Sequence, residues 1–419
     1  MTRHTAGRHR GAALIALLAL IGLVAVALVL GVAKAAADRS ARDRLTAAAL
    51  GKAVEALVAR AANDANRPGS LPCPDTDNNG SAELFAGANC PSYIGRLPWK
   101  TLDLPDLRDG DGERLWYALS PVFRDYPPGV NSDTAGQLQV TGMMPATNVI
   151  AIVFSPGASV GSQNRDSAGE NVVSNYLEGE NANGDSTYSN APRTDTFNDQ
   201  LLIVTSDDLM PAVERRVARE AKTCLSNFAA RNLGRFPWAA PLSSVTYDDS
   251  NGTLAGRIPA VLDDSGGSGL PSPAWSPASP PGAGTVTWPS SSGSVTTPCF
   301  GAGTWWDRWR DLLLYQVAGP YAPSPIGACP ADCLTVNGVG SVTAVVAVAG
   351  RAFSASPTQA RPSSTVADYL ETDPASGVNN ASAGSSKAFA RAPVSATPAA
   401  NFNDKIECIH LANLLPCGP

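Results

Sequence analysis

Histidine is scarce in this sequence. The 419 residues include three histidines, His4, His9 and His410. Imidazole is the usual general base near neutral pH and the commonest metal ligand in proteins. Three histidines therefore leave little material for histidine-based catalysis or metal binding. The cysteines also lack the paired C-x-x-C spacing that is typical of zinc sites, so the composition gives no support to a zinc protein.

Charge is the second shortage. Only 16% of the residues are charged, the formal net charge is −6 and the sequence pI is about 5.2. No long basic run follows the N-terminal segment. Because nucleic-acid-binding proteins normally present a basic face, we expect no nucleic acid among the partners of this chain.

Glycine and proline are abundant by contrast, with 38 and 34 residues. This composition favours a protein rich in strands and loops over a helical bundle. Hydrophobic residues make up 44% of the chain, which is enough for two or three domains with cores of their own.

Cysteine occurs in an even number, which indicates disulfides formed in an oxidising compartment. That places the large C-terminal part of the chain outside the cytoplasm. Cys224 and Cys299 pair only by elimination. Three other pairs are close enough in sequence to close short loops: Cys73 with Cys90, Cys329 with Cys333, and Cys408 with Cys417.

The N-terminal region contains one long uncharged run, residues 11–33. As a helix it spans about 33 Å, the thickness of a bilayer core. Three interpretations compete: an uncleaved signal anchor, a secretory signal cut before Ala36, and a short basic leader that ends at Gly11 and leaves the apolar helix in place. Arginine and lysine flank the run on both sides, so their count does not decide its orientation.

Apolar residues continue at helical spacing beyond this run, as the spacing of Leu50, Val54, Leu57 and Ala61 shows. The helix is therefore expected to continue as an amphipathic rod to about Asn66, where the sequence RPG stops it.

A basic leader ending in glycine, an aliphatic run and an amphipathic continuation together resemble the type IV pilin and type II secretion pseudopilin superfamily. The resemblance implies cleavage after Gly11 by a prepilin peptidase and methylation of the new N-terminus, Ala12. It departs from the family at Ala12, where Phe or Met is usual, and at Ala16, where major subunits carry Glu. The second departure points to a minor, tip-located subunit.

Several short segments recur in the same order along the chain. The echoes are collinear, and a fixed order of repeats indicates a duplicated unit. Each copy is expected to contain an amphipathic helix followed by short strands, and the second helix to cover about residues 211–232. The clearest echoes are SNYLEGENANG (174–184) with ADYLETDPASG (367–377), and FNDQLLIV (197–204) with FNDKIECI (402–409).

We therefore expect an α+β protein whose long N-terminal transmembrane and amphipathic helix precedes two tandem pilin-like modules, each a helix with a short antiparallel sheet. The expected divisions are a leader (1–11), the helix (12–66), a first head module (67–206) and a second module (207–419). The second module carries an insert rich in Ser, Pro and Gly at about residues 263–298.

The stretch DTDNNG, Asp75 to Gly80, begins like a calcium-binding loop, in which side-chain oxygens alternate and glycine allows a sharp turn. The glutamate expected at the twelfth loop position is replaced by Ala86. The candidate calcium ligands are Asp75, Asp77, Asn79 and Glu83. The alternative is a solvated turn without a metal. The same alternatives apply to RDGDGE (108–113).

Two further patterns have a functional interpretation. GASVG (157–161) matches a nucleophile elbow, with Ser159 as nucleophile and His410 as the single downstream base; a glycine- and serine-rich turn is the alternative. Tryptophans at 275, 288 and in WWDRW (305–309) indicate either a partner or glycan surface or core packing.

The combined features favour a non-enzymatic minor pilin or pseudopilin-like subunit that takes part in assembly or capping of a type IV pilus or type II secretion pseudopilus. The implied partners are other pilin subunits, the prepilin peptidase and the bacterial inner membrane, crossed once with a periplasmic head. No cofactor other than structural calcium is expected. The alternative is a membrane-anchored periplasmic or surface binding or adhesion protein that never enters a filament.

Overall fold

A computed structural model describes residues 9–260, 304–355, 358–392 and 401–410 of the chain. The fold is α+β, with a long N-terminal apolar helix and several small sheets. Two helices are long: α1 (His9–Asn63) and α2 (Ser206–Arg231). Two further helices have one turn each: α3 (Trp306–Trp309) and α4 (Ala383–Ser386).

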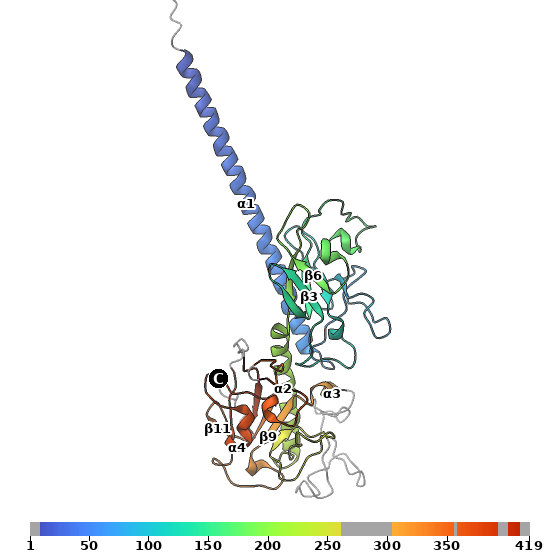
Figure 1. Cartoon of the computed structure of the whole chain (residues 1–419), viewed down its shortest axis with the longest axis vertical. Helices are drawn as coiled ribbons and strands as arrows, with labels where there is room; N and C mark the ends of the chain where they lie inside the picture. Colours follow the sequence, from blue (N-terminus) through green and yellow to red (C-terminus); the bar gives the residue numbers. More distant parts are fainter. Residues whose placement is uncertain (1–8, 261–303, 356–357, 393–400, 411–419) are drawn as a thin grey trace, which may run out of the picture.

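Helix α1 projects far beyond the rest of the chain (Figure 1). Residues 14–42 are exposed, whereas Thr46, Leu50, Leu57 and Ala61 on the following turns are buried. In the described part of the chain, α1 alone is long and apolar enough to cross a membrane. The apolar run and the amphipathic continuation thus form one unbroken helix, as expected.

Both long helices differ slightly from their expected bounds. Helix α1 ends at Asn63 instead of about Asn66, because the Asp64 carboxylate accepts the backbone N–H groups of Asn66 and Arg67 at 2.9 and 2.7 Å. Helix α2 begins at Ser206 instead of about Pro211, because Thr205 and Asp208 form a capping box at its N-terminus.

Two four-stranded antiparallel sheets repeat one topology. The first has the order β1-β2-β5-β7 and the second the order β8-β9-β12-β14. In both sheets the strands therefore lie side by side in the order in which they follow one another along the chain. Helix α1 packs on the first sheet and α2 on the second. The strands of the first sheet are β1 (Ile94–Arg96), β2 (Trp116–Leu119), β5 (Ala151–Ser155) and β7 (Gln200–Val204). Those of the second are β8 (Ala255–Arg257), β9 (Leu313–Val317), β12 (Ala344–Val348) and β14 (Lys405–Ile409).

Two three-stranded sheets also correspond, in the orders β4-β3-β6 and β11-β10-β13. Each contains one parallel pair, β3 with β6 and β10 with β13, which an entirely antiparallel sheet would not have. The first consists of β3 (Leu138–Gly142), β4 (Ala146–Val149) and β6 (Thr187–Asn190). The second consists of β10 (Leu334–Val336), β11 (Val339–Val342) and β13 (Ala388–Phe389). We call the part with α1 and β1–β7 the first unit, and the part with α2 and β8–β14 the second unit.

Two continuous apolar runs, residues 147–155 and 341–349, contain the central strands β5 and β12, and each run is divided between two sheets. Strand β4 precedes β5 in the first run and β11 precedes β12 in the second. Asn148 and Ser341 have positive φ angles of 56° and 64° at equivalent places just before the change of sheet. The backbone turns there, so one run serves two sheets.

One hydrophobic core connects both units, because the second half of α1 lies against α2. Figure 1 shows α2 (green) running from the end of the first unit through the second. The tryptophans of α3 belong to this core: Trp306 and Trp309 are buried. Core packing therefore accounts for the described part of the tryptophan-rich region. Trp275, Trp288 and the insert lie outside the described residues.

The expected short-range cysteine pairs form where the structure describes both partners. Cys73 and Cys90 are disulfide-bonded with Cα atoms 5.5 Å apart, and Cys329 and Cys333 with Cα atoms 5.0 Å apart. Cys224 and Cys408 are also in disulfides. Their expected partners, Cys299 and Cys417, lie outside the described residues.

We predict that the first of these disulfides stabilises the fold more than the second, because it closes a loop of 17 residues instead of 4. Loop-closure entropy gives about 3 kcal/mol for the longer loop and about 2 kcal/mol for the shorter. The measurement is thermal unfolding of the Cys73→Ser/Cys90→Ser and Cys329→Ser/Cys333→Ser double variants. A larger loss of stability in the second variant would contradict this ranking.

Candidate functional site

The first candidate site is the acidic loop that follows the Cys73 half-cystine. Backbone hydrogen bonds between Asp75 and Arg96 attach this loop to the end of β1. Single carboxylate oxygens of Asp75, Asp77 and Glu83 lie within 4.8 Å of one another. Asp75 is buried, Glu83 is half-buried and Asp77 is exposed. The structure thus brings together three of the four residues that the sequence singled out as calcium ligands.

The loop also satisfies much of its own hydrogen bonding. The Asp75 carboxylate accepts the N–H groups of Asp77 and Gly80 at 3.2 and 2.6 Å, and Glu83 accepts from the hydroxyl of Thr76 at 2.7 Å. Asn79 donates from its Nδ2 atom to Asp77 at 2.7 Å. These bonds are those of a tight turn and are equally compatible with a hard cation bound by oxygens. Burial, and next the neighbouring Asp77, raise the pKa of Asp75.

The last position of the loop, Gly80, requires a glycine for two reasons. Its φ angle is +88°, and a Cβ atom there would lie 2.6 Å from the Trp99 ring. Any side chain would therefore clash with that ring in addition to the backbone strain.

The second acidic loop, residues 108–113, is an anchor for α1. The Asp109 carboxylate accepts hydrogen bonds from the hydroxyl of Ser155 at 2.7 Å and the N–H of Gly157 at 3.0 Å, at the end of β5. The next residue, Gly110, donates its N–H to the Thr46 hydroxyl on α1 at 3.0 Å. The loop thus connects α1 to the end of β5 through Gly110 and Asp109. The sequence did not indicate this connection.

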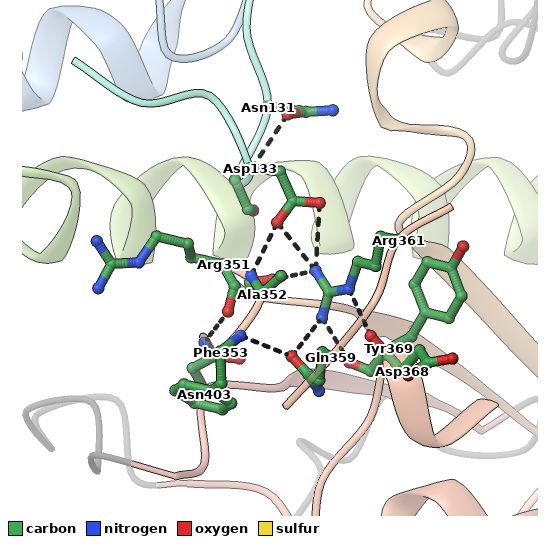
Figure 2. Close-up of polar contacts among 12 residues, drawn as sticks. Asn131, Asp133, Arg351, Ala352, Phe353, Gln359, Arg361, Asp368, Tyr369 and Asn403 are labelled. Carbon is green, nitrogen blue, oxygen red and sulfur yellow. Dashed lines mark hydrogen bonds and ion pairs between the residues drawn. The ribbon is translucent and has the colours of Figure 1, made fainter. Parts of the chain in front are cut away.

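The most extensive polar cluster of the second unit surrounds Arg361, whose side chain is 6% exposed (Figure 2). Its guanidinium donates to the carbonyl of Gly350 at 2.7 Å, to Oε1 of Gln359 at 3.0 Å and to the carbonyl of Tyr369 at 3.2 Å. Gln359 in turn donates to Glu371 at 2.7 Å. An arginine is needed here because a lysine could not supply so many fixed donors.

The first unit contains the same cluster around Arg165. This guanidinium donates to the carbonyl of Gly157 at 2.7 Å and to Gln163 at 2.8 Å, and Gln163 donates to Glu178 at 2.7 Å. Both arginines also lie over a tyrosine ring, Tyr176 in the first unit, at 4.7 and 5.1 Å. We call the two clusters the arginine networks.

The two sequence echoes meet in these networks. The glutamate of the YLE sequence accepts the backbone N–H of the asparagine of the FND sequence in each unit. The pairs are Glu178 with Asn198 and Glu371 with Asn403, both at 3.0 Å. The aspartate of the FND echo then accepts the N–H of that glutamate, at 2.9 Å for Asp199 and 3.0 Å for Asp404. Sequence reasoning found both echoes but missed the arginine and glutamine. The signal was a Q-x-R triplet before each YLE, at 163–165 and 359–361.

Each network contains a pair of buried carboxyl groups. Burial, and next the charge of Glu178, raise the pKa of Asp199 to about 8. Burial, and next the charge of Glu371, also raise the pKa of Asp404 well above its usual value. Two like charges this close in a dry site are unfavourable, so each pair holds a proton near neutral pH. In each pair the aspartate, Asp199 or Asp404, therefore tends to stay protonated.

The networks differ in the acid that meets the arginine. Arg165 forms an ion pair of 3.2 Å with Glu113 of its own unit, whereas Arg361 pairs at 3.1 Å with Asp133 of the first unit. Asp133 also accepts the N–H of Ala352 at 2.8 Å. Figure 2 shows the Asp133 carboxylate reaching both groups from the loop that carries Asn131.

The loop 131–134 of the first unit therefore completes the second unit. Its Asn131 donates to the carbonyl of Arg308 at 2.8 Å, and its Ser132 hydroxyl donates to Glu214 on α2 at 2.8 Å. Glu214 is buried, which raises its pKa, while the ammonium of Lys405 3.5 Å away opposes that rise. These contacts hold the units together at several points.

Ser159 lies exposed on the loop after β5. The residues that follow it up to 172 are all described and form turns without a helix. A nucleophile elbow needs a strand, a sharp turn and then a helix, so this local structure does not have the form of an elbow. His410, in the other unit, has its Nδ1 atom 3.2 Å from the carbonyl of Ser341.

No protein-family model matches this chain, and neither a curated protein nor a solved structure was found that matches it.

We predict that stability falls as the pH rises from about 5 to 8. In this window the folded state keeps the protons of the buried pairs while the unfolded state releases them, so the unfolding free energy decreases by up to about 1.4 kcal/mol per pH unit and pair. Asp199→Asn can replace the shared proton by an N–H group, and should flatten the dependence of the melting temperature on pH. The exposed Asp195→Asn is the control. An unchanged slope in Asp199→Asn would argue against the shared proton.

We also predict that Ca²⁺ stabilises the first acidic loop. At 10 mM, an affinity typical of extracellular calcium modules gives about 1–3 kcal/mol. Thermal unfolding with and without Ca²⁺ measures this, and Glu83→Gln should abolish the shift while the exposed Glu180→Gln should keep it. No shift in the unaltered protein would favour the solvated turn.

Proposed function

We propose that the chain is a minor pilin or pseudopilin-like subunit, held in the inner membrane by α1 and assembled into or onto a filament. The observation that carries the proposal is the division of α1. Its apolar first half, through Val32, is exposed, while its second half is packed into the head. An apolar helical surface of this length requires lipid or other helices around it.

Helix α1 contacts the head directly at the place where its exposed half ends, which supports a role in assembly. Arg42 on α1 lies 3.5 Å from Asp111 of the head, and Asp43 lies 2.9 Å from Arg193. Gly110 approaches the backbone of Arg42 so closely that a Cβ atom there would lie 2.3 Å from its carbonyl oxygen. Pulling on the head would therefore move the helix as one body.

Movement from the bilayer into a filament would then exchange lipid for the helices of other subunits. Lipid tails are about as apolar as leucine side chains, so this exchange depends on packing and not on the hydrophobic effect. The helix is the part that repeats between subunits in the proposed assembly. The head carries two pilin-like units in this proposal, and its bulk suits a tip better than a shaft.

We predict that the mature protein in native membranes begins with methylated Ala12, which intact-mass and peptide mass spectrometry can show. Gly11→Leu should block processing. Gly22→Leu is the matched control, because a Cβ atom added at Gly22 meets nothing within 4 Å in the structure, and it should be processed normally.

Two results would contradict the pilin-like role. A chain that begins at Ala36 would mean ordinary secretion. An intact N-terminus would mean a simple anchor, and would favour the membrane-attached binding or adhesion protein.

A further inference from the structure

The outer strands of the two four-stranded sheets differ in how their free sides are protected. These strands are β1 and β7 in the first unit, and β8 and β14 in the second. An outer strand exposes a row of backbone N–H and C=O groups, and natural proteins cover or charge such an edge to prevent unwanted pairing.

The edges of β1 and β8 are covered at equivalent places. Arg96 of β1 exchanges both of its backbone hydrogen bonds with Asp75, at 2.6 and 3.0 Å, on the side away from β2. Arg257 of β8 exchanges the same bonds with Ala240, at 2.8 and 3.0 Å. Both strands are also short, with three residues each, so neither offers room for an added strand.

Strand β14 is protected by charge. Its Lys405 and Glu407 form ion pairs with residues of α2 at 3.5 and 3.3 Å. Charged side chains on an outer strand oppose pairing with an apolar strand. The FND echo aligns Gln200 and Leu202 of β7 with these two residues, so the first unit has lost both charges.

Strand β7 lacks each of these protections. It has five residues, QLLIV, with no charge and no proline, and its register against β5 has no bulge. Leu202 at its centre is 39% exposed, and Gln200, Leu201 and Ile203 are half-buried. In the described part of the chain, only β5 and the residue before it form backbone hydrogen bonds with β7. Its outer side is therefore a free edge.

A second copy of the chain does not fit this edge by two-fold symmetry. Two β7 strands paired antiparallel would form one continuous sheet, with the two-fold axis perpendicular to it. Helix α1 packs along a face of this sheet, and its exposed half projects beyond the head (Figure 1). The axis would turn the two exposed halves in opposite directions, so both could not enter the same bilayer.

We propose that the free edge of β7 binds an extended, uncharged segment of a partner protein, which adds to the first sheet as a further strand. Backbone hydrogen bonds would supply the affinity, and apolar contacts beside Leu202 would select an uncharged segment. Strand addition of this kind does not require that the chain enters a filament.

The probe is a fluorescent peptide with the sequence of β5, AIVFS, flanked by lysines for solubility, because this sequence pairs with β7 within the fold. Fluorescence anisotropy measures its binding to the full chain in nanodiscs, with empty nanodiscs subtracted. We expect saturable binding. Leu202→Lys should weaken it at least about tenfold, because a charge then lies at the centre of the edge. Met143→Lys, at an exposed residue between β3 and β4, is the matched control and should bind normally.

Two N-methylated forms of the probe test the backbone ladder on the unaltered protein, so this result does not depend on how a variant folds. An added strand donates only alternate N–H groups to its neighbour. One form is methylated at the second and fourth residues of AIVFS, and the other at the third and fifth. One form should lose at least about tenfold in affinity, and the other should keep it.

Three results would overturn the proposal. Absence of saturable binding to the unaltered protein, or equal affinities of the two methylated forms, would exclude strand addition at β7. An equal loss in Leu202→Lys and Met143→Lys would place the probe elsewhere. A disulfide-linked dimer of Leu202→Cys in native membranes would assign the edge to a second copy instead of a partner protein, because Leu202 is the central residue of β7.

Discussion

The packing of α1 against α2 is the contact on which the rest of the structure depends. Small residues on α1, such as Ala53 and Ala61, share one core with Val213 and Val217 of α2, and all four are completely buried. Each helix also covers its own sheet. The two units therefore share one apolar core, and burial of that core fixes the direction in which the exposed half of α1 leaves the head.

The arginine networks add specificity to this core. Apolar packing tolerates many relative positions, whereas a buried arginine must keep all of its donors satisfied. Arg165 finds its acid within its own unit, and Arg361 finds Asp133 across the boundary. This difference makes the second unit complete only beside the first, which suits a head that moves as a single body with its helix.

The two units have kept their polar framework and diverged in their apolar layer. The same asparagine, aspartate and glutamate interactions recur in both, but the bulky layer above the first sheet is reduced above the second. A framework of buried hydrogen bonds is costly to change one residue at a time. Apolar residues on one face can change in size more freely, so this layer differs more between the two units.

The sequence by itself determined the features that depend on neighbouring residues. Hydrophobic spacing identified the long helix, close cysteines indicated the loops of Cys73–Cys90 and Cys329–Cys333, and collinear echoes indicated the repeat. The sequence also indicated that Asp75, Asp77 and Glu83 of the first acidic loop lie close together, because alternating oxygen-bearing residues followed by a glycine are a local pattern.

Only the tertiary structure decided which distant residues meet. Asp133 and Arg361 are 228 residues apart, and no local pattern relates them. The division of each apolar run between two sheets, and the free edge of β7, likewise depend on how strands from separate segments align. The physical reason is that propensity and periodicity act within one element, whereas contacts between elements depend on the packing of the whole chain.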